Sequence, residues 1–231
     1  MTRRVVVLGH SHMMAIAHAA LERPEFRTIQ LLDPAFDPVL AEGQINQAVI
    51  DAFLAEPFDA VALTLGGNEH VVLGLVEHPQ PFDFTFVDGE DLGDAASARE
   101  RVPVELVRRA IGRMLIYSRQ FLEKFRALTD APMYLLEPPP PIRSDKHLLE
   151  YGGVFVKEME ARGIAPPRLR HKLWTLQTDI YADMAAAIGV TYLRAPPEAI
   201  DPDGMLAERA WNLDATHANP WYGSLVLEQL R

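Results

Sequence analysis

The segment VVVLGHSH, residues 5–12, decides the fold. Its first four residues are apolar and mostly β-branched, which predicts a strand that is buried on both faces. The strand ends at Gly9, and His-Ser-His follows at positions 10–12. The alanine-rich stretch from Met13 to Leu21 has no Gly or Pro and predicts a helix. A buried strand that leads through a short polar turn into a helix is the beginning of a βαβ unit.

The same alternation of strands and helices continues along the chain. Further strands are predicted at Thr28–Leu32, Ala60–Leu65, Met133–Leu136 and Val190–Leu193. Helices are predicted at Gln44–Leu54, Val104–Leu128, Leu169–Ile188 and Trp221–Leu230. This order predicts βαβ crossovers, and therefore a mostly parallel sheet with helices on both of its faces.

The 231 residues fit one domain, because no linker divides the chain into two cores and no internal repeat is visible. Two stretches have little periodicity. The first, residues 77–101, is rich in Asp and Gly and carries phenylalanines at every second position from Phe82 to Phe86. The second is residues 139–167. Because long loops in a compact domain are usually functional or disordered, we expect a single domain over residues 1–231 with irregular excursions at these two stretches.

Composition excludes several classes of function. The chain has 22 Lys and Arg residues against 32 Asp and Glu residues, a formal charge of −10. Nucleic acids and anionic membranes are usually met by basic patches, so neither is expected as a partner. The absence of cysteine excludes disulfides, thiolate metal sites and a cysteine nucleophile. No apolar run approaches the roughly 18 residues of a membrane span, and the apolar N-terminal stretch is too short for a signal peptide. A cytoplasmic location is therefore expected.

Three polar clusters occur at the ends of predicted elements. His10-Ser11-His12 follows the first strand, Gly66-Gly67-Asn68-Glu69-His70 follows the third, and Asp214-Ala215-Thr216-His217 precedes the last helix. Ligands of open parallel sheets bind beyond the carboxyl ends of the strands. We therefore expect the three clusters to lie at one edge of the sheet and to form a site together.

The residue types in these clusters suit acyl transfer. A serine hydroxyl is a weak nucleophile until a base takes its proton, and His217 can take the proton of Ser11. Asp214, three residues earlier, can hold the tautomer of His217 and stabilise its imidazolium form. The Ser11 N–H lies where a helix begins, and with the Asn68 amide it can donate hydrogen bonds to an oxyanion. One such donor is worth about 3–4 kcal/mol of the barrier.

The clusters resemble the conserved blocks of the SGNH hydrolases, the superfamily of the GDSL esterases and lipases. Gly9-His10-Ser11 is similar to the first block, Gly66-Gly67-Asn68-Glu69 to the third, and Asp214-Ala215-Thr216-His217 to the fifth. Gly43 lies in the interval of the second block, which supplies a further oxyanion N–H. His10 and Glu69 stand where the family pattern has aspartates, and neither position is that of the nucleophile or the base.

The resemblance implies a flavodoxin-like three-layer α/β/α sandwich with a mostly parallel five-stranded sheet, and the removal of acyl groups, often acetyl groups on carbohydrates. It implies Ser11, Asp214 and His217 as the catalytic triad, and Ser11, Gly43 and Asn68 as the oxyanion hole. No cofactor or metal is expected, and the partner is a small-molecule or saccharide ester. The residues expected to contact the substrate are His10, His12, Gly67, His70 and Trp211.

Other interpretations remain open from the residues. Met13 stands where the nucleophile elbow of the α/β-hydrolases has its second glycine, which disfavours that fold. The histidines at positions 10, 12, 70 and 217 are compatible with a metal-dependent phosphoesterase or amidohydrolase. A site that keeps water out can transfer the acyl group to a sugar hydroxyl instead of hydrolysing it. A non-catalytic binding protein can also retain such a triad.

Overall fold

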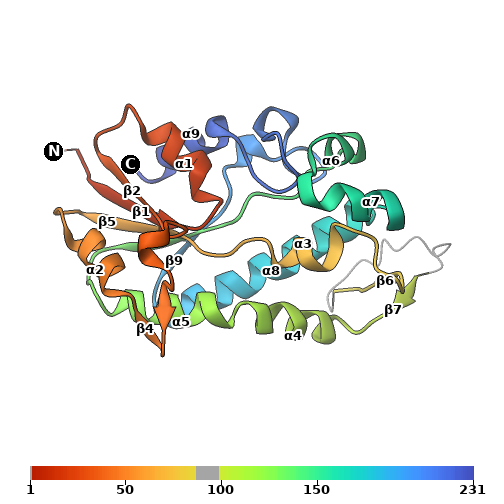
Figure 1. Ribbon diagram of the computed structural model, residues 1–231, viewed down its shortest axis with the longest axis horizontal. Coiled ribbons are helices and arrows are strands. Elements are labelled where there is room, and N and C mark those ends of the chain that lie inside the picture. Colours follow the sequence, from red (N-terminus) through yellow and green to blue (C-terminus); the bar gives the residue numbers. More distant parts are fainter. Residues whose placement is uncertain (1, 87–98) are drawn as a thin grey trace.

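A parallel sheet of five strands forms the centre of the computed structural model, which describes residues 2–86 and 99–231 (Figure 1). Its strands are β1 (Val5–Gly9), β2 (Phe26–Gln30), β5 (Ala60–Thr64), β8 (Met133–Leu136) and β9 (Thr191–Leu193). Their order across the sheet is β2-β1-β5-β8-β9, and all four pairings are parallel. Numbered along the chain this is 2-1-3-4-5, the flavodoxin-like order.

Helices cover both faces of this sheet. The helices α1 (Met13–Ala20), α9 (Pro220–Gln229), α6 (Asp145–Tyr151) and α7 (Val156–Arg162) lie on one side. The helices α2 (Gln47–Leu54), α4 (Val104–Met114), α5 (Ile116–Arg126) and α8 (Pro167–Ile188) lie on the other. In Figure 1, α1 and α9 lie above the sheet and α2 and α5 below it. The three-layer α/β/α sandwich predicted from the sequence is confirmed.

The two core layers follow from the alternation of side chains along the strands. In β1, Val5 and Val7 pack against α1 and α9, whereas Val6 and Leu8 pack against the layer that contains α2 and α8. All four are at most 1% exposed. A strand buried on both faces reads as a continuous apolar run, which is why residues 5–8 could be assigned from sequence.

Several short elements complete the described ranges. They are the hairpin β3 (Leu40–Ala41) and β4 (Gln44–Ile45), the parallel pair β6 (Phe82–Asp83) and β7 (Glu100–Arg101), α3 (Glu69–Gly74), and the 3-10 turns η1 (Pro34–Phe36), η2 (Gly153–Phe155), η3 (Pro197–Ala199) and η4 (Glu208–Ala210). No helix in residues 2–86 and 99–231 is both long and apolar enough to cross a membrane.

Two predicted helices were wrong in their extent. The helix predicted from Gln44 begins at Gln47, because Asn46 caps it by accepting a hydrogen bond from the Ala48 N–H at 2.9 Å, and the preceding residues form the hairpin. The helix predicted from Val104 to Leu128 is two helices, α4 and α5, which meet at Leu115. Leu115 is buried in the same core as its helical neighbours, so the apolar pattern continues across the break and does not reveal it.

The two stretches predicted as irregular contain regular structure. Residues 139–167 include α6 and α7, which pack Leu148 and Met159 into the core. The Ser144 hydroxyl accepts a hydrogen bond from the His147 N–H at 3.2 Å and caps α6, a local signal that sequence inspection can use. In residues 77–101, only β6 and β7 are regular among the described residues, and residues 87–98 lie outside the described ranges.

Candidate active site

The three polar clusters come together at the carboxyl ends of β1 and β5. These strands are neighbours, with Gly9 paired to Thr64, so the turns that follow them lie side by side. The Gly66 N–H donates to His10 Nδ1 at 3.3 Å, which joins the first and second clusters. The third cluster joins through the ring of His217, whose centroid lies 4.9 Å from that of His12. The expected meeting of the clusters is therefore found in the structure.

Ser11 lies in the turn between β1 and α1 and is half-buried. Neither its N–H nor its hydroxyl makes a hydrogen bond to another described residue, so both are free to interact with a ligand. A cavity of about 360 Å³ opens beside Ser11. It is lined by Ser11, Met14, Ala15, His18, Asn212, His217, Ala218 and Pro220. The candidate nucleophile and the candidate base thus face the same cavity.

Asp214 and His217 form a tight pair. His217 Nδ1 lies 3.1 Å from Asp214 Oδ2, which also accepts a hydrogen bond from Asn212 Nδ2 at 2.8 Å. The backbone N–H groups of Thr216 and His217 donate to Asp214 Oδ1 at 2.8 and 2.7 Å. Partial burial acts to raise the pKa of Asp214, but these hydrogen bonds outweigh it and hold the pKa at about 2. The carboxylate therefore stays ionised and keeps the Nδ1–H tautomer of His217, which leaves Nε2 as the acceptor.

Ser11 and His217 are not hydrogen-bonded to each other. His217 Nε2 is buried and has no partner among the described residues. Both residues nevertheless line one cavity. Catalytic hydrogen bonds are often long or misaligned before substrate binds, and they tighten in the complex.

The loop after β5 holds Asn68 at the beginning of α3. Gly66 and Gly67 have φ values of +59° and +109°, conformations that residues with a side chain rarely adopt. The Gly67 N–H donates to Glu69 Oε2 at 3.0 Å, and the Gly67 carbonyl accepts from Gln177 Nε2 at 3.0 Å. Burial raises the pKa of Glu69. Glu69, which stands where the SGNH pattern has an aspartate, therefore stabilises the loop through its hydrogen bond with the Gly67 N–H.

Of the other predicted contact residues, His12 and Gly67 lie at the site, whereas His70 lines a neighbouring cavity together with Ala215 and Thr216. The His70 ring is buried, with Nδ1 3.2 Å from Gln177 Oε1, and burial lowers its pKa to about 4. His10 lines a separate cavity of about 500 Å³ together with Asp33, Asp37 and Tyr117. Burial also lowers the pKa of His10.

Trp211 and Gly43 are not among the residues that line the cavity beside Ser11. The Trp211 ring packs on His147, with centroids 5.0 Å apart, and its Nε1–H donates to the Leu206 carbonyl at 2.8 Å. Gly43 lies in the turn of the β3–β4 hairpin, where its nearest neighbour is the side chain of Lys124 in α5. No contact of Gly43 with Ser11 or Asn68 is found among the described residues, whereas Ser11 lines one cavity with His217 and Asn68 contacts His12 beside His217.

Sequence inspection did not single out several residues that shape the site. Asn212 steadies the Asp214 carboxylate, and His18 and Pro220 line the cavity. Gln177 holds the loop after β5 from the middle of α8, more than 100 positions away, so no local pattern marks it. No three His, Asp or Glu side chains in the described ranges gather as a group that could hold a metal ion.

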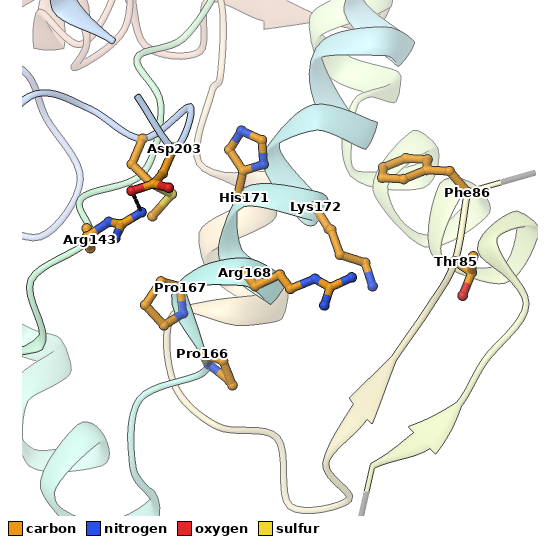
Figure 2. A pocket seen from close by; sticks show the side chains of 10 residues that line it. Thr85, Phe86, Arg143, Pro166, Pro167, Arg168, His171, Lys172 and Asp203 are labelled. Carbon is orange, nitrogen blue, oxygen red and sulfur yellow. Dashed lines mark ion pairs between the residues drawn. The ribbon is translucent and has the colours of Figure 1, made fainter. Parts of the chain in front are cut away.

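A further cavity, of about 620 Å³, lies at the beginning of α8 and is lined by none of the predicted site residues (Figure 2). Two of its basic side chains form ion pairs, whereas Arg168 forms none with another described residue. Arg143 forms an ion pair with Asp203, and Lys172 forms one with Asp83. Burial lowers the pKa of His171, which favours its neutral form. A single guanidinium without an ion-pair partner among the described residues does not indicate a particular ligand.

The buried histidines predict acid sensitivity of the fold. Burial, together with the charges of His217 and His70, lowers the pKa of His12 to about 3, and burial lowers that of His70 to about 4. Unfolded histidines titrate near 6.5, so the stability is present above about pH 6.5 and is lost as the pH falls toward the folded values. Each histidine contributes a loss of about 1.4 kcal/mol per pH unit in that window.

We expect urea unfolding at pH 7, 6 and 5 to report this loss as a falling free energy of unfolding. His12→Gln should reduce the loss of unfolding free energy per pH unit to about half of the wild-type value, because one of the two buried histidines is removed. The control His18→Gln changes an exposed histidine of α1 and should leave the slope unchanged. A wild-type stability that does not change between pH 7 and pH 5 would contradict the neutral, buried state of both histidines.

Comparison with known proteins gives likenesses of fold. No family profile and no curated protein matches the sequence. A protein of Slackia heliotrinireducens, provisionally described as an SGNH hydrolase, is 18% identical with a TM-score of 0.49, over 99% of this chain and 98% of that one. A GDSL-like lipase of Bacteroides thetaiotaomicron is 12% identical with a TM-score of 0.44, over 99% and 87%. Identities and TM-scores this low describe a likeness of fold and do not assign an activity to this chain.

Proposed function

We propose that this chain is a serine esterase of the SGNH type that hydrolyses esters of small acyl groups, acetyl above all. The observation that carries the proposal is the arrangement at the cavity beside Ser11. There, a serine whose hydroxyl has no partner among the described residues lines the same cavity as a histidine whose Nδ1 is held by a carboxylate. Such a constellation is recognised by its geometry and roles, whatever the fold that carries it.

The proposed reaction has two halves. His217 Nε2 takes the proton of Ser11 Oγ, which attacks the ester carbonyl and forms a tetrahedral oxyanion. The Ser11 N–H and Asn68 Nδ2, neither of which has a partner among the described residues, would donate hydrogen bonds to that oxyanion. Collapse releases the alcohol, which takes the proton from His217, and leaves an acyl-enzyme. Water, deprotonated by His217, then attacks the acyl carbonyl, and Ser11 is regenerated with release of the carboxylic acid.

The size and lining of the cavity favour a small substrate. About 360 Å³ is at the lower end of small-molecule pockets, and both apolar and polar side chains line it. A second cavity, entered beside His10, adjoins the same turn and offers the carboxylates of Asp33 and Asp37 and the Tyr117 hydroxyl. Hydroxyl-rich alcohols such as saccharides would find hydrogen-bonding partners there, which supports a sugar as the alcohol part of the ester.

The proposal is tested by combining hydrolysis with covalent labelling. We expect p-nitrophenyl acetate to be hydrolysed faster than the butyrate ester, and EDTA to have no effect. Phenylmethylsulfonyl fluoride should abolish the activity, and peptide mass spectrometry should find the label on Ser11. Hydrolysis that is lost with EDTA, with no label on Ser11, would replace the proposal by a metal-dependent mechanism. Acetylated sugar formed from an acetyl donor, with little free acetate, would instead identify an acyltransferase.

A further inference from the structure

We infer that His12 is a positioning residue, which orients the side-chain amide of Asn68 so that its NH2 group faces the reacting oxyanion. The inference rests on the proposed esterase function. It starts from one contact, in which His12 Nε2 lies 3.1 Å from Asn68 Oδ1. Asn68 is the candidate oxyanion donor, and His12 follows the candidate nucleophile directly in the chain.

A histidine at this position is unfavourable for packing alone. Its side chain is only 7% exposed, and its Nδ1 is buried with no partner among the described residues. A buried polar atom without a partner destabilises the folded state, whereas an apolar side chain of similar size would fill the same space without that penalty. Among the described residues, the His12 ring forms one hydrogen bond, between its Nε2 and Asn68 Oδ1. An apolar side chain of similar size could not form this hydrogen bond, because it has no donor.

The direction of the hydrogen bond fixes the amide. Asn68 Oδ1 can only accept, so His12 must carry its proton on Nε2 and leave Nδ1 bare. Asn68 Nδ2 then lies on the other side of the amide and has no partner among the described residues. In the reversed amide, Oδ1 would face the oxyanion and repel it. The tautomer of His12 therefore determines whether Asn68 can donate a hydrogen bond to the oxyanion.

The His12 ring is itself held from two sides. A Cβ on Gly67 would lie 2.6 Å from His12 Cδ2 and 2.7 Å from Nε2, so the absence of a side chain at Gly67 lets the ring lie against the loop. The His217 ring packs on it at 4.9 Å and 54°. Burial and the neighbouring His217 and His70 hold the pKa of His12 near 3, against the opposing influence of Asn68 and Asp214. The donor is therefore neutral at any working pH.

The first test does not depend on activity. In protein with ¹⁵N-labelled histidine, NMR of the ring nitrogens should find His12 in the neutral Nε2–H tautomer, with no titration between about pH 8 and pH 5. Its signals should be absent in His12→Gln, which assigns them. An Nδ1–H tautomer for His12 would overturn the inference, because its Nε2 could then only accept a hydrogen bond and Asn68 would turn its NH2 group toward His12 and its oxygen toward the site.

The second test is a double-mutant cycle on the hydrolysis of p-nitrophenyl acetate. His12→Leu and Asn68→Ala should each lower kcat by about 10²–10³-fold with little change in KM, as expected for the loss of one oxyanion donor. The double variant should be no slower than Asn68→Ala alone, because His12 acts through Asn68. His12→Gln keeps a neutral donor and should restore kcat to within about tenfold of wild type.

Losses that multiply in the double variant, with circular dichroism and melting temperature unchanged, would overturn the inference and give His12 a separate role. Equal losses in His12→Gln and His12→Leu would overturn it as well. Failure of the proposed function looks different. In that case wild type and Ser11→Ala are equally inactive on esters, while the tautomer of His12 still reports whether it orients Asn68.

Discussion

Ser11→Ala is expected to lower kcat for p-nitrophenyl acetate by about 10⁴–10⁶-fold, the range in which loss of a serine nucleophile falls. The physical reason is that no other hydroxyl lines the cavity beside His217. The backbone N–H of residue 11 and the Asn68 amide remain in the variant, so residual catalysis from oxyanion binding should persist at a low level.

A control substitution at a second serine, Ser224, tests whether the loss of activity is specific to Ser11. Ser224 lies in α9, where its hydroxyl donates to the Pro220 carbonyl at 3.1 Å, and Ser224→Ala should keep nearly full activity. Both variants should melt within a few degrees of wild type, because neither hydroxyl is buried in the core. A Ser11→Ala variant that retains more than about a tenth of the wild-type kcat would rule out Ser11 as the nucleophile.

The fold could be predicted because its central strands are buried on both faces. Residues 5–8, 60–65 and 133–136 each read as a short apolar run between turns, and parallel strands produce that pattern. The helix boundaries were harder to predict. Leu115 continues the apolar periodicity across the junction of α4 and α5, so the break depends on packing that no local pattern encodes.

The meeting of the three polar clusters could be predicted for a similar reason, whereas their catalytic roles stay a prediction. The clusters lie in short motifs at element ends, and parallel strands bring such ends to one edge of the sheet. The support around the triad could not be predicted in this way. The contact between His12 and Asn68 requires the pairing of Gly9 with Thr64, and Gln177 reaches the loop across the fold from α8. The contact of His70 with Gln177 likewise depends on the packing of α8, from which Gln177 comes.

Asp214→Asn is expected to lower kcat at pH 7 by about 10⁴-fold while the fold persists. The asparagine oxygen can still accept the backbone hydrogen bonds from Thr216 and His217, so the turn should keep its shape. Its NH2 group, however, can donate to His217 Nδ1 and so shift the imidazole proton to Nε2. A His217 that carries its proton on Nε2 cannot accept the proton of Ser11, and the rate falls for that reason. The matched control Asp51→Asn changes an exposed carboxylate of α2 and should leave kcat unchanged.

The pH dependence of the activity distinguishes Asp214 from His217. Because hydrogen bonding holds the pKa of Asp214 at about 2, protonation of Asp214 does not contribute to a fall of wild-type activity above about pH 4. A rate that stays flat from about pH 8 to pH 5 would contradict an imidazole base. The lowered pKa also adds about 1–2 kcal/mol to the stability, discounted for a side chain that is 32% exposed. That contribution is present above about pH 4 and is lost as the pH falls toward 2, so Asp214→Asn should unfold at lower urea than wild type at pH 7 and at the same urea near pH 2.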